Sequence, residues 1–101
     1  MLKAVFYKGA GGFTGFSVSG HAGYGTEGND IVCAAITSAV ELTCNTVTEF
    51  FGAEACAEVF ENEVRLTLGK PDAPSQQLIA SLCAHIENIA REHKKIRLEI
   101  K

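Results

Sequence analysis

Two stretches of the chain place apolar residues at helical spacing along one side only, and this feature limits the folds open to the chain. The first stretch runs from about residue 30 to residue 51, and the second follows the helix-breaking segment 69–74. A helix with one apolar side needs a second layer to cover that side. The two stripes are Ile36, Val40, Thr43, Val47, Phe50 and Phe51 in the first helix, and Leu78, Ile79, Leu82, Ile86, Ile89 and Ala90 in the second.

The ends of the first helix are also marked in the sequence. Asn29 or Asp30 can cap its amino terminus with a side-chain oxygen. Gly52 stands where a residue of left-handed conformation commonly closes a helix. These signals predict a helix that is bounded at both ends.

The sheet that would cover these helices is predicted from segments rich in β-branched, aromatic or alternating apolar residues. Sequential hairpins favour antiparallel pairing, and two one-sided helices favour packing on a single face. We therefore expect one domain over residues 1–101, an α+β two-layer sandwich of order ββαββαβ with a mostly antiparallel sheet. The predicted strands are 2–8, 13–19, 56–60, 64–68 and 96–100, with hairpin turns at 9–12 and 61–63.

The first hairpin carries more apolar residues than one sheet face can hold. If Leu2, Phe6 and Phe13 point at the helices, strict alternation sends other large side chains to the opposite face. A second subunit could cover that face. The residues expected there are Val5, Tyr7, Phe16 and Val18.

Composition excludes several classes of protein. Apolar residues make up 47% of the chain, which is enough for a buried core without disulfide or metal support. The formal charge of −3 gives no overall basic field, so we expect no direct binding to nucleic acid. Lysines interrupt the apolar amino terminus, and no uninterrupted apolar run approaches the roughly 20 residues of a membrane span. These features predict a cytoplasmic protein without a membrane partner.

The residues that could carry out chemistry are concentrated in segment 19–35, where a predicted strand is followed by a predicted helix. Cys33 falls within about the first turn of that helix, where unpaired amides and the helix dipole favour a thiolate. His21 leaves the strand and could form an ion pair with the thiol. The pattern is typical of a thiol nucleophile with a histidine partner, although a small buried hydrophobe is the other interpretation of Cys33. Cys44, Cys56 and Cys83 lack this position.

Two rival patterns lack their required context. Residues 23–28 spell G-x-G-x-x-G, but a dinucleotide site needs an acidic residue at the end of a second strand about 20 residues later. In this chain the acidic residue at about that distance is Glu49, which lies inside the predicted helix and not at the end of a strand. The four cysteines form no C-x-x-C pair, so we expect neither a zinc site nor another metal site.

The sequences Ser-Gly-His-Ala-Gly-Tyr at 19–24 and Asp-Ile-Val-Cys-Ala-Ala at 30–35 resemble the bacterial ribosomal-processing cysteine protease family Prp. The resemblance extends along the chain in length and in element order. It implies that His21 and Cys33 are the catalytic pair and that Asp30 is the third member. The residues that it implies for substrate binding are Gly20, Ala22, Gly23, Tyr24, Gly25 and Ala34.

The resemblance also implies an activity. A member of this family is a cysteine endopeptidase that removes the amino-terminal extension of large-subunit ribosomal protein twenty-seven during ribosome assembly, acts as a homodimer and needs no cofactor. Segment 22–29 would close over the peptide as a lid. Two other functions stay open at this point, namely a non-catalytic ribosome-assembly or peptide-binding module and a thiol-dependent redox sensor.

Overall fold

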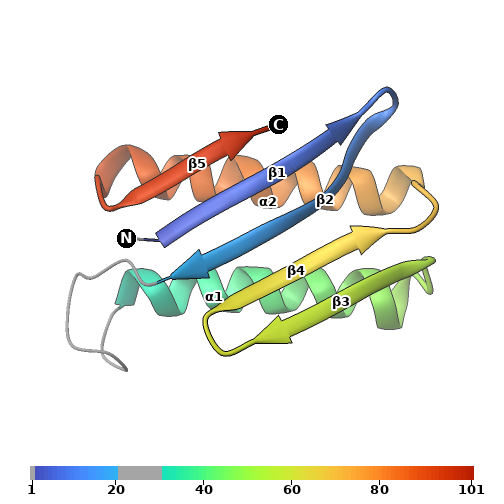
Figure 1. Ribbon diagram of the computed structural model, residues 1–101, viewed down its shortest axis with the longest axis horizontal. Helices are drawn as coiled ribbons and strands as arrows, with labels where there is room; N and C mark the ends of the chain where they lie inside the picture. The colour runs from blue at the N-terminus through green and yellow to red at the C-terminus, as the bar shows by residue number, and fades with distance from the viewer. Residues whose placement is uncertain (1, 21–30) are drawn as a thin grey trace.

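The computed structural model describes residues 2–20 and 31–101, and within these ranges the predicted order ββαββαβ is confirmed (Figure 1). A single π-helical segment, η1, continues the first helix. Both helices lie on the same side of the sheet, as predicted for a two-layer sandwich. The elements are β1 (Leu2–Gly9), β2 (Gly12–Gly20), α1 (Ile31–Asn45), η1 (Thr46–Phe50), β3 (Ala55–Phe60), β4 (Glu63–Leu68), α2 (Ala73–Glu92) and β5 (Ile96–Ile100).

The five described strands form one sheet in the order β3-β4-β2-β1-β5. The pairings of β3 with β4, β4 with β2 and β2 with β1 are antiparallel, whereas β5 runs parallel to β1. The parallel pair follows from the connection through α2, because a helical crossover returns the chain in the direction that it left. The sheet is therefore mixed, with the mostly antiparallel character that was predicted.

A bulge in the first hairpin corrects the predicted division of its side chains. Residue partners run from Tyr7–Gly15 to Lys8–Phe13, so Thr14 is skipped. Directly opposed residues in an antiparallel pair share a face, and Phe16 opposes Phe6. The skipped residue brings Phe13 to that same face, where its ring lies 6.0 Å from that of Phe6.

The inner face of the sheet is consequently more apolar than strict alternation allows. Phe16 and Val18 lie in the core with Leu2 and Phe6, so their expected place on the opposite face is wrong. They pack with α1 and α2 in one buried cluster. Its main helical members are Ile36, Val40 and Val47 from α1 and η1, and Ile79, Leu82 and Ile86 from α2.

The opposite face of the sheet is mainly polar. Lys3, Ser17 and Arg65 lie there with Val5 and Tyr7, as the register of the strands requires. Glu99 on β5 forms an ion pair with Lys3, whose Nζ lies 3.9 Å from Glu99 Oε2. Val5 and Tyr7 therefore lie on this face as expected, and charged side chains stand there in place of Phe16 and Val18.

The end of the first helix departs from the predicted stripe. Ile36, Val40, Thr43 and Val47 are buried as predicted, but Phe50 is 83% exposed and Phe51 is 44% exposed. The Phe51 N–H donates to the Thr46 carbonyl at 2.8 Å, which widens the last turn and rotates the residues that follow. Gly52 then closes the segment with φ +60°, as predicted.

The close contact between β2 and β4 at Gly15 can be tested by substitution. A Cβ at this position would stand 2.3 Å from the Leu66 carbonyl oxygen, so Gly15→Ala must displace backbone. We expect this substitution to lower the free energy of unfolding by about 1–3 kcal/mol. Urea denaturation followed by circular dichroism measures the change.

Gly11→Ala is the matched control, because nothing lies within 4 Å of a Cβ built there. It should change the free energy of unfolding by less than about 0.5 kcal/mol. Equal stability of the two variants would contradict the assigned contact between β2 and β4.

Candidate active site

The candidate site begins where β2 ends. Gly20 has φ +83°, a left-handed conformation that favours glycine. Its N–H donates to the Asn62 carbonyl at 2.9 Å, so the turn between β3 and β4 is fastened to the end of β2. The residue that follows in the sequence is His21. Figure 1 shows α1 beginning at this same end of the sheet.

Cys33 is the third residue of α1 and is partly buried. Amides in the first turn of a helix have no acceptor within the helix, and they create a positive potential there. The first turn of α1 contains no acidic residue. Val40 follows Cys33 by about two turns, which places both side chains within about 20° of each other on the helix. Because Val40 is buried in the core, Cys33 lies on the side of α1 that faces the sheet.

The other cysteines differ from Cys33 in position and environment. Cys44 is buried deeper along α1, and burial, followed by the charge of Glu41, raises the pKa of its thiol to about 11. Burial also raises the pKa of the Cys83 thiol, with a smaller contribution from Glu87. Cys56 is exposed on β3. Among the four, Cys33 alone combines partial exposure with a helix amino terminus.

The structure places only part of the predicted site. Gly20 closes β2, Cys33 lies in the first turn of α1, and Ala34 follows it as an exposed residue. The proposed cap residues of α1 and the expected lid 22–29 lie outside the described residues. The remaining predicted site residues also lie outside them, namely His21, Ala22, Gly23, Tyr24, Gly25 and Asp30.

A polar network on the outer face of the sheet was not predicted. The Ser17 hydroxyl donates to Glu63 Oε2 at 2.6 Å, and Arg65 Nε donates to the same oxygen at 2.8 Å. The Arg65 guanidinium also lies 5.2 Å from the centre of the Phe60 ring. Hydrogen bonds from Arg65 and then Ser17 lower the pKa of the Glu63 carboxyl. This Ser17–Glu63–Arg65–Phe60 network links β2, β4 and β3.

Only part of this network could have been predicted from the sequence. Alternation along one strand places Glu63 and Arg65 on the same face. Ser17 joins them only through the register of β2 on β4, which spacing within one segment does not specify. No group of three or more His, Cys, Asp or Glu side chains in residues 2–20 and 31–101 is arranged to hold a metal ion.

The arrangement supports nucleophilic chemistry by a thiol. A thiol at a helix amino terminus can act as a nucleophile, and nearby amides can stabilise an oxyanion. The residue after the end of β2 supplies an imidazole in the sequence. These parts fit acyl transfer to sulfur.

Comparison with known proteins agrees with that chemistry. The family described as cysteine protease Prp matches residues 1–97. The ribosomal processing cysteine protease Prp of Bacillus subtilis (strain 168) is 28% identical over 90 residues, which cover 82% of this chain and 80% of the relative.

Solved structures share the fold. The essential ribosomal processing protease Prp from S. aureus, with a covalently linked product peptide, gives a TM-score of 0.92 at 20% identity and covers 100% of both chains. The same S. aureus protease with a substrate peptide gives 0.86 at 18% identity, again over 100% of both chains. SMU.848 from Streptococcus mutans gives 0.81 at 22% identity, over 100% of this chain and 96% of that protein.

The difference between the cysteines predicts selective alkylation. Near pH 8 a thiol with a pKa of about 11 is ionised in only about one molecule per thousand. We therefore expect iodoacetamide to modify Cys33 and the exposed Cys56 in the folded protein, but not the buried Cys44 and Cys83. Peptide mapping by mass spectrometry identifies the modified residues.

The control is the protein in urea, where all four thiols should react. Modification of Cys44 as fast as that of Cys33 in the folded protein would show that the position of Cys33 confers no distinct reactivity.

Proposed function

The chain belongs to the Prp family of cysteine proteases, and from this premise we propose that Cys33 is its nucleophile and that its substrate is the amino-terminal extension of a ribosomal protein. The observation that carries the proposal is the position of Cys33 in the first turn of α1, on the side that faces the sheet. The family assignment makes the chain a peptide-bond hydrolase. What is proposed is the identity of the catalytic residues and of the peptide.

In the proposed mechanism, His21 accepts the thiol proton and the Cys33 sulfur attacks the carbonyl carbon of the scissile peptide bond. Amides in the first turn of α1 stabilise the oxyanion that forms. His21 then protonates the leaving amine, and a thioester remains on Cys33. Water attacks this thioester with His21 as base, which releases the carboxylic acid and restores the thiol. Asp30 orients the imidazole. All protons and electron pairs are accounted for without a cofactor.

The peptide substrate is supported by the relatives. The B. subtilis relative is a ribosomal processing protease, and the S. aureus protease was solved with a substrate peptide and with a product peptide. We take the substrate of this chain to be the extension of large-subunit ribosomal protein twenty-seven. The contacts to it are assigned to Gly20, Ala34 and segment 22–25. This substrate places the enzyme in the cytoplasm, where ribosomes assemble.

Replacing either proposed catalytic residue tests the mechanism. Cys33→Ala and His21→Ala should each lower turnover by roughly a thousandfold or more, because each removes a member of a unit that acts together. Mass spectrometry of the ribosomal protein with its extension, incubated with each variant, detects the new amino terminus.

Cys83→Ala is the control, since Cys83 lies on α2 and has no role in the proposed mechanism. Circular dichroism confirms that each variant is folded. Full activity of a folded Cys33→Ala would exclude this cysteine as the nucleophile. Binding of the extension without any cleavage by the unsubstituted protein would favour the peptide-binding alternative.

We also propose a homodimer, with the exposed side of α1 as its interface. Ile31 is 83% exposed and Leu42 is 68% exposed. Their directions around the helix axis differ by only about 20°, and the small residues Ala35 and Ser38 lie between them on the same side. Segment 31–50 is long and apolar enough by length and composition to cross a membrane, although its inner side belongs to the core. A second copy of α1 suits this side, because small residues allow close approach of two helices and a two-fold axis pairs the patch with itself.

Leu42→Glu tests the interface, because it places a charge at the carboxyl-terminal end of the exposed apolar patch on α1. Size-exclusion chromatography with light scattering should give twice the chain mass for the unsubstituted protein and the chain mass for Leu42→Glu. The matched control is Ile100→Glu on β5, an exposed apolar residue remote from α1, which should remain dimeric. A monomeric unsubstituted protein would contradict the proposal.

A further inference from the structure

We propose that β3 is the strand to which an extended, positively charged peptide substrate adds. The inference rests on the proposed protease function and deepens it, since it specifies where the peptide lies and which charge it carries. Four observations support it: the exposed edge of β3, its place relative to α1, its fastening to β2, and the distribution of charge along the chain.

The first observation is that β3 is an edge strand along its whole length. It stands at one end of the described sheet, and every residue from Cys56 to Phe60 is exposed. Val59 is 78% exposed although its partner Val64 packs against the core. An edge strand offers unpaired N–H and C=O groups, and an extended peptide can pair with them while side-chain pockets read alternate residues. The exposed Val59 offers an apolar surface that a side chain of such a peptide can contact.

The second observation concerns the two edges of the sheet. In Figure 1, α1 lies behind β3 and β4, whereas α2 lies behind β1 and β5. The helix that carries Cys33 therefore packs behind the half of the sheet that ends in the β3 edge. The β3 strand runs toward the turn that holds Gly20, so a peptide paired with β3 is led to the end of the sheet where β2 ends and α1 begins.

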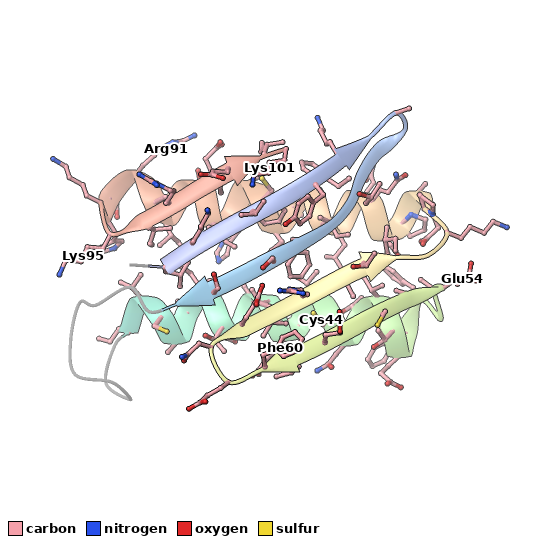
Figure 2. The ribbon with its side chains drawn as sticks, viewed as in Figure 1. Cys44, Glu54, Phe60, Arg91, Lys95 and Lys101 are labelled. Carbon is pink, nitrogen blue, oxygen red and sulfur yellow. The ribbon has the colours of Figure 1, made fainter. Side chains whose placement is uncertain are left out.

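The third observation is that β3 is held in place from the outer face. Phe60, labelled on β3 in Figure 2, lies under the guanidinium of Arg65. Arg65 donates to Glu63, and Glu63 accepts from Ser17 on β2. An edge fixed before binding loses little conformational freedom when a strand adds to it. The Ser17–Glu63–Arg65–Phe60 network thus holds β3 in the extended conformation that a template strand needs, and it lies on the outer face, away from the edge where a peptide would pair.

The fourth observation is a separation of charge along the sequence. Residues 9–64 contain eight Asp and Glu residues and no Lys or Arg. On β3 and its turn, Glu58 and Glu61 are exposed, and the one nearby cation, among the described residues of this hairpin, is Arg65, which is engaged by Glu63. The β5 edge instead carries Arg97 and Lys101, with Glu99 between them in ion pairs with Lys3 and Lys101. A cationic peptide is therefore attracted more to β3 than to β5.

N-methylation of the substrate tests the pairing. A synthetic peptide that spans the cleavage site of the extension is prepared as a series, each member methylated at one backbone nitrogen. Strand addition uses every second N–H of the added chain, so we expect KM to rise about tenfold or more at alternate positions and to change little at the positions between. This readout requires no substitution in the protein.

The outcomes of this series are distinct. Cleavage of the parent peptide with an alternating profile supports the inference. Cleavage with a flat profile overturns strand addition and leaves the protease function intact. Failure to cleave the parent peptide or the extended ribosomal protein overturns both.

Charge substitutions test the choice of edge. Glu58→Lys should raise KM for a lysine-containing peptide by about fivefold at low salt, with kcat unchanged, and the difference should vanish near 0.5 M NaCl. Glu58→Gln should give a smaller increase in the same direction. The matched control is Glu92→Lys at the exposed end of α2, which changes the net charge equally and should leave KM unchanged. Equal effects of Glu58→Lys and Glu92→Lys would overturn the docking on β3.

Discussion

The pairing of β1 with β2 is the constraint on which the rest of the structure depends. Phe6 and Phe16 face each other across this pair with ring centres 5.7 Å apart, and the bulge at Thr14 adds Phe13 to the same face. This concentrates three aromatic rings under the helices. Because the inner face is that apolar, both helices pack on one side, and the outer face is left to polar and charged side chains.

That constraint also shows what the sequence can predict. Helical spacing correctly predicted which residues of α1 and η1 are buried, as far along the chain as Val47. It also correctly predicted the buried stripe of α2. It failed at Phe50 and Phe51 because periodicity assumes a constant turn, and the wider turn of η1 rotates both side chains toward solvent. It failed again at Phe16 and Val18, since one skipped residue reverses the alternation on which the division of faces relied.

The candidate site divides in the same way between local and non-local information. Cys33 could be singled out because a helix amino terminus is a local feature, marked by the residues around it. The Ser17–Glu63–Arg65–Phe60 network could not, since it joins residues from three strands whose register is decided by packing of the whole sheet. The parallel pairing of β5 likewise depends on where a crossover ends.

The placement of Cys33 has a mechanical consequence. The side of α1 that carries the thiol is the side that packs into the core, so the first turn is positioned by the buried residues that follow it. The end of β2 is fixed independently, through the hydrogen bond between Gly20 and Asn62. Two rigid elements therefore hold the two ends of segment 21–30, and their separation is a property of the sheet and its helix. The geometry of the proposed nucleophile is accordingly coupled to the core, and we expect a substitution that shifts α1 against β2 to alter catalysis without touching a proposed catalytic residue.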